Sequence, residues 1–312
     1  MLAAILFATL INPIPLNDLG PAPYAYGYIG GLYENGTNFD PADHLAIGLQ
    51  RAAAIKNGSV FLAIGFGETQ RIFDAFTAMT RNDPRVNHDM TLIDAACEGC
   101  DFNAWIPPQS DGTFNRIRNT QLAPAGFSDA DVQVVWMQQV TNDPFASLTK
   151  GDGDGYRLKG SIATVLRALK ARYPNLQIAY LSSRVYGGYA TTNWNPEPYA
   201  YESALSVRWI VMGQISWERT GGLWDTRIGN INDLTDNAPW VAWGPYLWAN
   251  GSVPRSDGLT WQRDDFEADG ETLSPKGAQK GAQLLFQFLL DEPTASWFRA
   301  PDSLLRLRPV RH

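Results

Sequence analysis

Basic clusters are scarce in this sequence, and their scarcity limits its partners. The 312 residues carry 32 Asp and Glu against 25 Lys and Arg, which gives a formal net charge of −7. Nucleic-acid binding needs a clustered positive footprint, so we expect no nucleic-acid partner. One basic cluster stands at the end, RLRPVRH at 306–312, and we interpret it as solvated within a C-terminal tail at 299–312.

Apolar runs long enough to span a bilayer are missing after the first residues, so we expect no membrane span. The start, MLAAILFATLI, has the length of the apolar core of a secretion signal. No basic segment precedes it, and no small-residue cleavage site follows it. Residues 1–16 are therefore either a truncated signal or an N-terminal extension that begins the fold.

Histidine and cysteine are also rare, with three and two residues. His44, His88 and His312 show no metal-ligand spacing, so we expect neither a metal nor another cofactor. The pair Cys97 and Cys100, in CEGC, fits a redox motif, half of a zinc site or a local disulfide. We favour two small residues in a tight loop, and the sequence leaves open whether they are bridged.

Short apolar segments alternate with helical patterns along the chain. The expected strands are 59–65, 90–96, 132–137, 176–182 and 240–244. The expected helices are 40–55, 70–81, 157–173, 202–216 and a last one opened by Ser274 and Pro275. Near-continuous apolar strands separated by helices predict a parallel sheet covered on both faces.

The pattern predicts one domain at 17–298. Residues 217–263 are rich in Trp, Gly, Asp and Asn, and we interpret them as an insertion beside the site. Ligands of open parallel sheets bind at the carboxyl ends of the strands. The loops to inspect are therefore 65–70, 95–101, 138–143, 183–201 and 264–273.

Several long segments resemble the SGNH/GDSL hydrolase superfamily, and within it a branch of mostly secreted bacterial proteins. They are NDLGPAPYAYGYIGGLYENGTNFDPADH at 17–44, YLSSRVYGGYATTNWNPEPYAYESALSVRW at 180–209, WGPYLWANGSVPRSDGLTW at 243–261 and DFEADGETLSPKG at 265–277. The resemblance implies a three-layer αβα sandwich with a flavodoxin-like parallel sheet. It also implies esterase or deacetylase descent and a secreted or periplasmic location in bacteria.

The chemistry of this superfamily needs a serine after the first strand and a histidine near the C-terminus, oriented by an aspartate three residues before it. Related proteins read Gly-x-Ser-Asn-Thr after that strand, whereas this chain places Gly67 at the serine position. Asp269 matches the aspartate, but Thr272 occupies the histidine position. Glycine offers no nucleophile, and a threonine hydroxyl cannot take a proton near neutral pH.

The loops that would form an oxyanion hole are partly kept. The segment 94–101, DAACEGCD, matches a loop that reads Asp-Gly-Ala-Gln-Gly-Gly in relatives, with Gly99 retained. Cys97 and Glu98 depart from that pattern. After the third strand, the resemblance makes Gln138 and Asn142 candidate amide donors.

The departures from the family pattern add carboxylates near the catalytic positions. Glu68 follows the serine position and Glu271 precedes the histidine position, and with Asp269 they are our candidate catalytic residues. Paired carboxylates perform acid–base hydrolysis in glycosidases, and carboxylate clusters also hold hard cations. The remaining alternative is that each is a solvated loop acid.

The segment 183–202 is dense in residues that recognise polar ligands such as sugars. Together with one tryptophan from the insertion, the candidate ligand contacts are Arg184, Tyr186, Tyr189, Asn195, Glu197, Tyr201 and Trp248. The same residues also suit the helix start and the core, and the sequence does not separate these roles.

The leading hypothesis is a protein that has lost Ser–His catalysis and binds a polar, carbohydrate-like small molecule or glycan. The first alternative is an active ester or glycan hydrolase with a reassigned carboxylate site. The second alternative is a non-catalytic structural or assembly protein. The sequence leaves open whether the chain is an enzyme, which ligand it binds and its oligomeric state.

Overall fold

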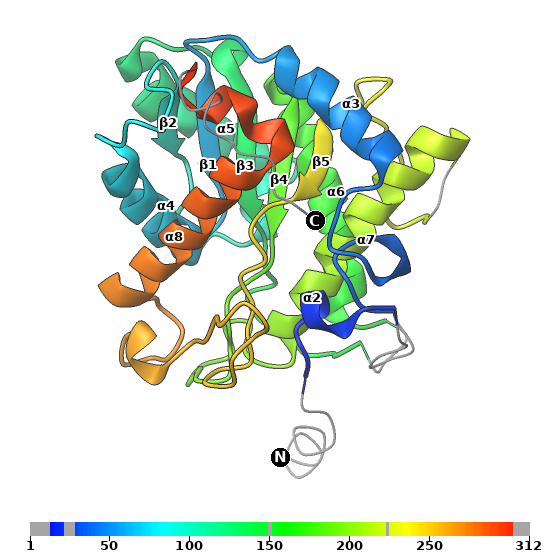
Figure 1. Ribbon diagram of the computed structural model, residues 1–312, viewed down its shortest axis with the longest axis vertical. Helices are drawn as coiled ribbons and strands as arrows, with labels where there is room; N and C mark the ends of the chain where they lie inside the picture. Colours follow the sequence, from blue (N-terminus) through cyan, green and yellow to red (C-terminus); the bar gives the residue numbers. More distant parts are fainter. Residues whose placement is uncertain (1–12, 22–28, 149–151, 223–224, 302–312) are drawn as a thin grey trace, which may run out of the picture.

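The computed structural model describes residues 13–21, 29–148, 152–222 and 225–301 (Figure 1). Most of the expected N-terminal signal or extension and of the basic tail, residues 1–12 and 302–312, lies outside the described residues. Among the residues described, no helix combines the length and the apolar content needed to cross a membrane.

A five-stranded parallel sheet forms the centre of the structure, with strand order β2-β1-β3-β4-β5. The strands are β1 (Val60–Ile64), β2 (Thr91–Asp94), β3 (Val132–Gln138), β4 (Ile178–Ser182) and β5 (Trp240–Trp243). Each expected strand is present within one or two residues of its predicted ends. The predicted parallel sheet is therefore confirmed.

Both faces of the sheet are buried because successive side chains of a strand point to opposite sides. In β1, Val60, Leu62 and Ile64 join one hydrophobic cluster, while Phe61 and Ala63 join the other. A strand of this kind needs apolar residues at every position, which explains the continuous apolar runs of the sequence.

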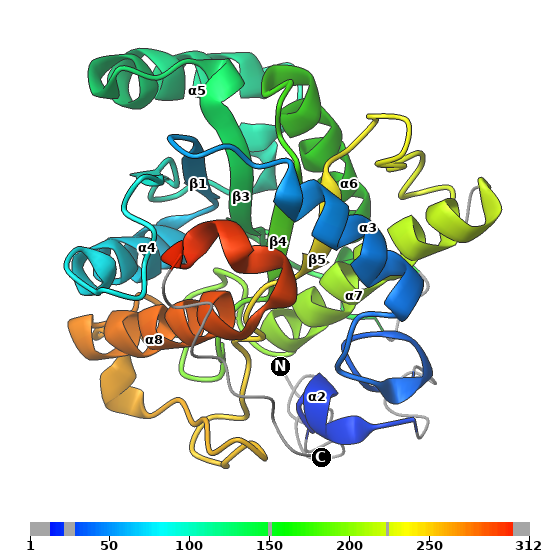
Figure 2. The same cartoon turned by 45° about the horizontal axis from the view of Figure 1, so that its top comes forward.

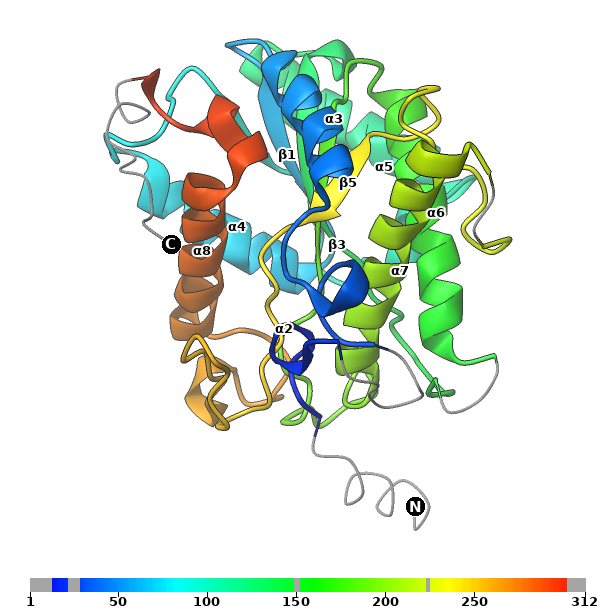
Figure 3. The ribbon, with the colours of Figure 1, turned by 45° about the vertical axis from the view of Figure 1, so that its right-hand side comes forward.

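Helices cover the two faces, and the predicted three-layer αβα sandwich is confirmed (Figures 1 and 3). One hydrophobic cluster takes residues from α5, α6 and α7, and the other takes residues from α3, α4 and α8. Figure 2 shows α3 and α8 over the same face of the sheet. The helices are α2 (Leu16–Leu19), α3 (Ala42–Ala53), α4 (Gly67–Thr80), α5 (Gln109–Ile117), α6 (Asp154–Arg172), α7 (Tyr199–Thr220) and α8 (Pro275–Asp291).

Short helical turns complete the connections. They are Glu34–Gly36, Phe102–Trp105, Arg118–Leu122, Ala123–Ala125, Asp129–Asp131, Arg263–Asp265 and Pro293–Phe298. The helix α5 and the turns around it were not predicted, because Phe114 and Ile117 are the only large apolar residues among the nine of α5.

Four expected helix starts differ from the structure by two or three residues, and two of these, α6 at Asp154 and α7 at Tyr199, begin three residues before their predicted starts. The helix α3 begins at Ala42, two residues after its predicted start, and no side chain caps it. The helix α4 begins at Gly67, three residues before the predicted start, and this places its N-terminus at the predicted serine position. By contrast, Ser274 caps α8 as the sequence indicates, by accepting a hydrogen bond from the Gly277 N–H at 3.3 Å.

The Trp-rich region 217–263 contains the end of α7 and all of β5, so it is built into the sandwich. Trp248 and Trp261 within it are fully buried. Its long connection after β5 runs beneath the carboxyl ends of the strands in Figure 1, beside the loop that precedes α8.

Candidate functional site

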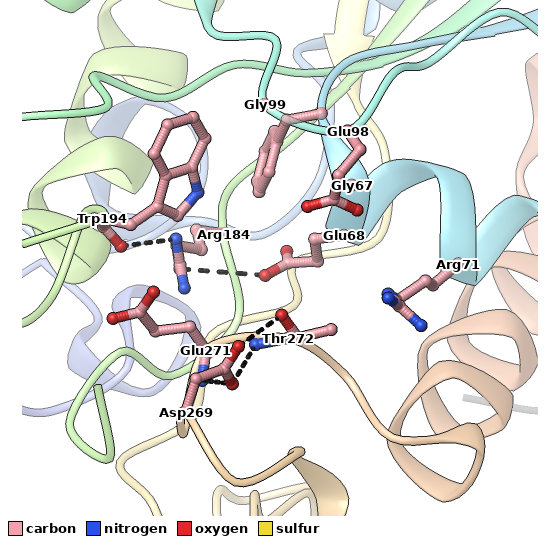
Figure 4. Close-up of a pocket in the computed structure, with 11 residues that line it drawn as sticks. Gly67, Glu68, Arg71, Glu98, Gly99, Arg184, Trp194, Asp269, Glu271 and Thr272 are labelled. Atoms are coloured by element: carbon pink, nitrogen blue, oxygen red, sulfur yellow. Dashed lines mark hydrogen bonds and ion pairs between the residues drawn. The ribbon is translucent and has the colours of Figure 1, made fainter. Parts of the chain in front are cut away.

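A cavity of about 250 Å³ lies at the carboxyl end of the sheet, at the N-terminus of α4 (Figure 4). The order of the sheet reverses between β1 and β3, and open α/β sheets bind ligands at such a point. The cavity is lined by Phe66, Gly67, Glu68, Arg71, Glu98, Gly99, Arg184, Trp194, Asp269, Glu271 and Thr272. The structure therefore brings the predicted serine, histidine and aspartate positions together.

The space beside Gly67 is occupied by the carboxylate of Glu98. A Cβ atom at position 67 would lie 2.7 Å from both Cδ and Oε1 of Glu98, which is closer than any real Cβ contact. The side chain of Glu98 is exposed and makes no hydrogen bond to the described residues. Because the N-terminus of α4 carries a partial positive charge, it favours a carboxylate here. The Glu98 carboxylate thus occupies the space that a side chain at position 67 would take.

A disulfide between Cys97 and Cys100 closes the loop that carries Glu98. Gly99 within this loop has a φ of 72°, which an L side chain rarely adopts. The cysteines therefore act as a local clamp, which was one of the alternatives that the sequence left open. The disulfide and Gly99 together fix the backbone conformation that places Glu98 beside Gly67.

Thr272 is hydrogen-bonded to Asp269 on the side of the cavity opposite Gly67 and Glu98 (Figure 4). The Thr272 hydroxyl donates to Oδ2 of Asp269 at 2.7 Å, and the N–H groups of Thr272 and Glu271 both donate to Oδ1 at 2.9 Å. Burial acts to raise the pKa of Asp269, but these three donors outweigh it and hold that pKa below its usual value. Asp269 is consequently ionised, and its oxygens are committed to its own loop.

Glu68 and Arg184 form a buried ion pair below the cavity, with 3.8 Å between Glu68 Oε2 and Arg184 Nε. Oε1 of Glu68 accepts from the side-chain amide of Gln138 at 2.9 Å and from the Val185 N–H at 3.2 Å. Burial nevertheless raises the pKa of Glu68, against the opposing effect of Arg184. Neither Glu68 Oε2 nor Arg184 Nε has a hydrogen-bond partner among the described residues.

The rest of the lining combines one more acid, one base and two aromatic rings. Oε1 of Glu271 accepts from the N–H and hydroxyl of Thr192 at 2.8 and 2.6 Å. Arg71 is exposed one turn after Gly67, with no partner among the described residues. Trp194 is half-buried, and its carbonyl accepts from Arg184 at 3.0 Å.

No histidine of the described residues lines the cavity. His44 belongs to α3 and is fully buried, with Nδ1 2.7 Å from the Glu218 carboxylate and Nε2 2.9 Å from the Val241 carbonyl. His88 contacts the Asp83 carbonyl on the surface. His312 lies outside the described residues. Thr272 supplies the cavity's hydroxyl, and no imidazole accompanies it.

The predicted oxyanion residues separate into three positions. Gly99 lines the cavity. Gln138 lies beneath it, where its amide donates to Glu68 and to the Ser183 carbonyl. Asn142 is exposed and outside the lining. These residues do not converge on one point as oxyanion donors must.

Of the predicted ligand contacts, Arg184 alone lines the cavity. Glu197 instead ties its own loop together, since it accepts from the Trp248 indole at 2.7 Å and from the Tyr201 N–H at 3.1 Å. Trp248 is fully buried, and Tyr201 nearly so, which leaves neither ring a free face.

The remaining predicted contacts pack around this cluster. Tyr186 packs edge-on against Tyr189, whose hydroxyl donates to the Trp261 carbonyl. Asn195 is buried, and its amide donates to the Thr141 carbonyl at 3.4 Å. These side chains shape the wall behind Trp194 rather than the cavity surface.

Sequence reasoning missed Glu98, Arg71 and Trp194 as lining residues. The only signal for Glu98 in the sequence was that related loops have glycine at its position. Glu98 lies beside Gly67 in space, although the two residues are far apart in the sequence. Arg71 follows from the observed start of α4, which places it one turn after Gly67. Across the part of the chain that the structure describes, no group of three His, Cys, Asp or Glu side chains is arranged to hold a metal ion.

Comparison with known proteins adds structural neighbours. No protein-family model matches the sequence, and no curated protein matches it. The structure is similar to a proposed acylhydrolase from Bacteroides fragilis, with a TM-score of 0.41 and 13% identity over 82% of this chain and 100% of that one. It is also similar to a proposed GDSL-like lipase from Parabacteroides merdae, with a TM-score of 0.37 and 16% identity over 75% and 96%. A phospholipase A1 from Streptomyces albidoflavus matches with a TM-score of 0.25 and 12% identity over 72% and 99%.

The chain folds as a five-stranded parallel sheet of order β2-β1-β3-β4-β5 with helices on both faces, a three-layer αβα sandwich. The sheet order is that of the flavodoxin-like sheet which the sequence resemblance implied. As the resemblance also implied, one cavity is lined by Gly67, Asp269 and Thr272.

Proposed function

We propose that this cavity binds a polar, carbohydrate-like ligand and that the protein does not perform Ser–His ester hydrolysis. The observation that carries the proposal is the replacement at both catalytic positions. Gly67 has no side chain, and Thr272 is hydrogen-bonded to Asp269 where an imidazole would be needed. Attack by a hydroxyl on a carbonyl requires a general base within hydrogen-bond reach.

The lining supports a polar ligand rather than an acyl chain. Phe66 and Trp194 are its only aromatic or aliphatic members, and the others are charged, glycine or threonine. The volume of about 250 Å³ lies just below the range of about 300–1,000 Å³ for drug-sized ligands. This volume suits one sugar-sized unit. The half-buried ring of Trp194 supplies a flat wall for such a unit.

The test has a catalytic arm and a binding arm. The pure protein is offered a chromogenic acetate ester and an acetylated sugar, with Glu267→Gln, an exposed change outside the cavity, as a control for contaminating esterases. We expect hydrolysis at the rate of the buffer alone and binding to members of a diverse polysaccharide array. Ester turnover by the unaltered protein, above that rate and in proportion to its concentration, would contradict the proposal.

A second candidate function is hydrolysis by carboxylates. Glu68 is buried with a raised pKa, whereas Glu98 is exposed, and both adjoin Gly67. Pairs of carboxyl groups perform acid–base hydrolysis in glycosidases. Chromogenic glycosides test this candidate. Glycoside hydrolysis that Glu98→Gln removes would support hydrolysis by carboxylates. If none of the glycosides is hydrolysed, this candidate is excluded and the binding function is favoured.

We also propose that the protein is secreted or periplasmic and that residues 17–298 form its functional unit. The Cys97–Cys100 disulfide supports the location, because disulfides persist mainly in oxidising compartments. Thiol alkylation of the protein in freshly lysed cell fractions, followed by mass spectrometry, shows whether the pair is oxidised where the protein resides.

A further inference from the structure

The cavity lining carries more negative than positive charge once the ion pair within it is set aside. The lining has the carboxylates of Glu68, Glu98, Asp269 and Glu271 against the guanidinium groups of Arg71 and Arg184. Glu68 and Arg184 neutralise each other below the cavity. Three carboxylates then face the cavity, opposed by Arg71 and by the partial positive charge of the α4 N-terminus beside Glu98, so the field of the cavity favours a cation.

Glu98 is the least committed of these carboxylates. Both oxygens of Asp269 accept hydrogen bonds from their own loop, and one oxygen of Glu271 is held by Thr192. Glu98 makes no hydrogen bond to the described residues, although the disulfide fixes its backbone. A carboxylate that is held in place but has no donor is a ready partner for an ammonium group.

Polar atoms at the cavity floor point to a ligand that also carries hydroxyl groups. Glu68 is 95% buried and Arg184 is 99% buried, yet Glu68 Oε2 and Arg184 Nε lack hydrogen-bond partners within the described structure. Figure 4 shows this pair between Glu98 and the Asp269–Thr272 pair. An acceptor and a donor 3.8 Å apart match a hydroxyl group, which would donate to one and accept from the other after a small side-chain movement, because neither atom has accessible surface in this structure.

We propose that the cavity selects a sugar unit that bears a primary ammonium group, with Glu98 as the carboxylate that binds the ammonium. This inference rests on the proposed binding function and names its ligand class. An amino sugar supplies a cation and hydroxyl groups on one small ring. A lysine side chain or a polyamine brings a cation on an apolar stem, for which Phe66 and Trp194 are the only apolar walls.

The test uses three disaccharides with the same β-1,4 linkage: dimers of glucosamine, of N-acetylglucosamine and of glucose. They differ only in whether C2 of each ring carries an ammonium, an acetamide or a hydroxyl group. Binding is measured by calorimetry and by saturation-transfer NMR, with spermidine as a cation that has no sugar ring. The variants are Glu98→Gln and the exposed control Glu267→Gln.

The expected result is about tenfold tighter binding of the glucosamine dimer than of the glucose dimer, which is the factor that one charge-assisted hydrogen bond supplies. Glu98→Gln should abolish the difference and Glu267→Gln should keep it. Equal binding of all three dimers would overturn the ammonium preference while leaving the binding function intact. Spermidine binding as tight as that of the glucosamine dimer would overturn the sugar requirement. If the protein binds none of the three dimers and no other glycan, both proposals are overturned.

Discussion

Thr272 and Asp269 are joined by a 2.7 Å hydrogen bond, with Asp269 further fixed by two backbone N–H groups. The aspartate holds the threonine hydroxyl at the place where a serine hydrolase would hold an imidazole. Hydrogen bonds within the loop therefore fix Asp269 and Thr272, and no histidine of the described residues lines the cavity beside them. Across the cavity, α4 begins at Gly67, and Glu98 fills the space that a side chain at position 67 would take.

Restoring ester hydrolysis is expected to work best with three substitutions, because the exposed Glu98 side chain must move aside for a Cβ at position 67. Gly67→Ser and Thr272→His supply the hydroxyl and the base, but a Cβ at position 67 would lie 2.7 Å from Glu98 Oε1 and Cδ. Glu98→Gly removes this collision. We expect measurable kcat/KM on a chromogenic acetate ester for the triple variant, at least tenfold above the double variant.

The control for this experiment is the triple variant with Gly67→Ala in place of Gly67→Ser. It has the same free space but no hydroxyl, so its rate should equal that of the unaltered protein. Equal rates for the double and triple variants would show that Glu98 does not obstruct position 67.

Removing one member of the Glu68–Arg184 pair is expected to destabilise the fold strongly. Arg184→Met leaves the buried Glu68 carboxylate without its cation, at a cost of about 3–5 kcal/mol in the free energy of unfolding. Adding Glu68→Gln removes the charge and keeps an oxygen for Gln138 and Val185, so most of the loss should be recovered. Urea denaturation of the single and double variants measures both effects, and an unrecovered loss would show that Arg184 acts through packing alone.

The stability of the protein is expected to depend on Asp94 between about pH 4 and 7. Burial raises the pKa of this carboxyl to about 7; Asp74 adds to the effect, and the Ala96 N–H and Arg116 oppose it. In the unfolded chain the pKa is about 3.9. In that window the folded state therefore keeps a proton that the unfolded state has lost, and the stabilisation present below pH 4 disappears as the pH rises through 7.

Asp94→Asn isolates this dependence, because the asparagine oxygen can still accept from the Ala96 N–H. The gain in unfolding free energy of Asp94→Asn over the unaltered protein should grow from pH 4 to 7 and level off above it. Asp89→Asn, an exposed change, should show no such growth. A difference that is constant with pH would contradict the raised pKa.

Loss of the Cys97–Cys100 disulfide is expected to affect binding more than folding. A four-residue loop contributes about 2 kcal/mol in the chain-entropy description. The variant with Cys97→Ser and Cys100→Ser should keep its far-UV circular dichroism spectrum but lose most of the preference for the glucosamine dimer, because Glu98 is no longer held beside Gly67. An unchanged preference would show that the loop needs no clamp.

The sequence by itself determined the sheet, most of the helices and the absence of a serine–histidine couple at the expected positions. Strand and helix patterns arise from local periodicity, and Gly67 and Thr272 are read directly from the chain. Only the tertiary structure decided what fills those positions. Glu98 reaches Gly67 from another loop, and Glu68 pairs with Arg184 from 116 positions away. No local pattern encodes such contacts, because they depend on how loops from separate strands converge at one edge of the sheet. The same physics assigned Tyr201 and Trp248 to the core: a ring that suits a sugar also suits a buried wall, and the packing around it decides between them.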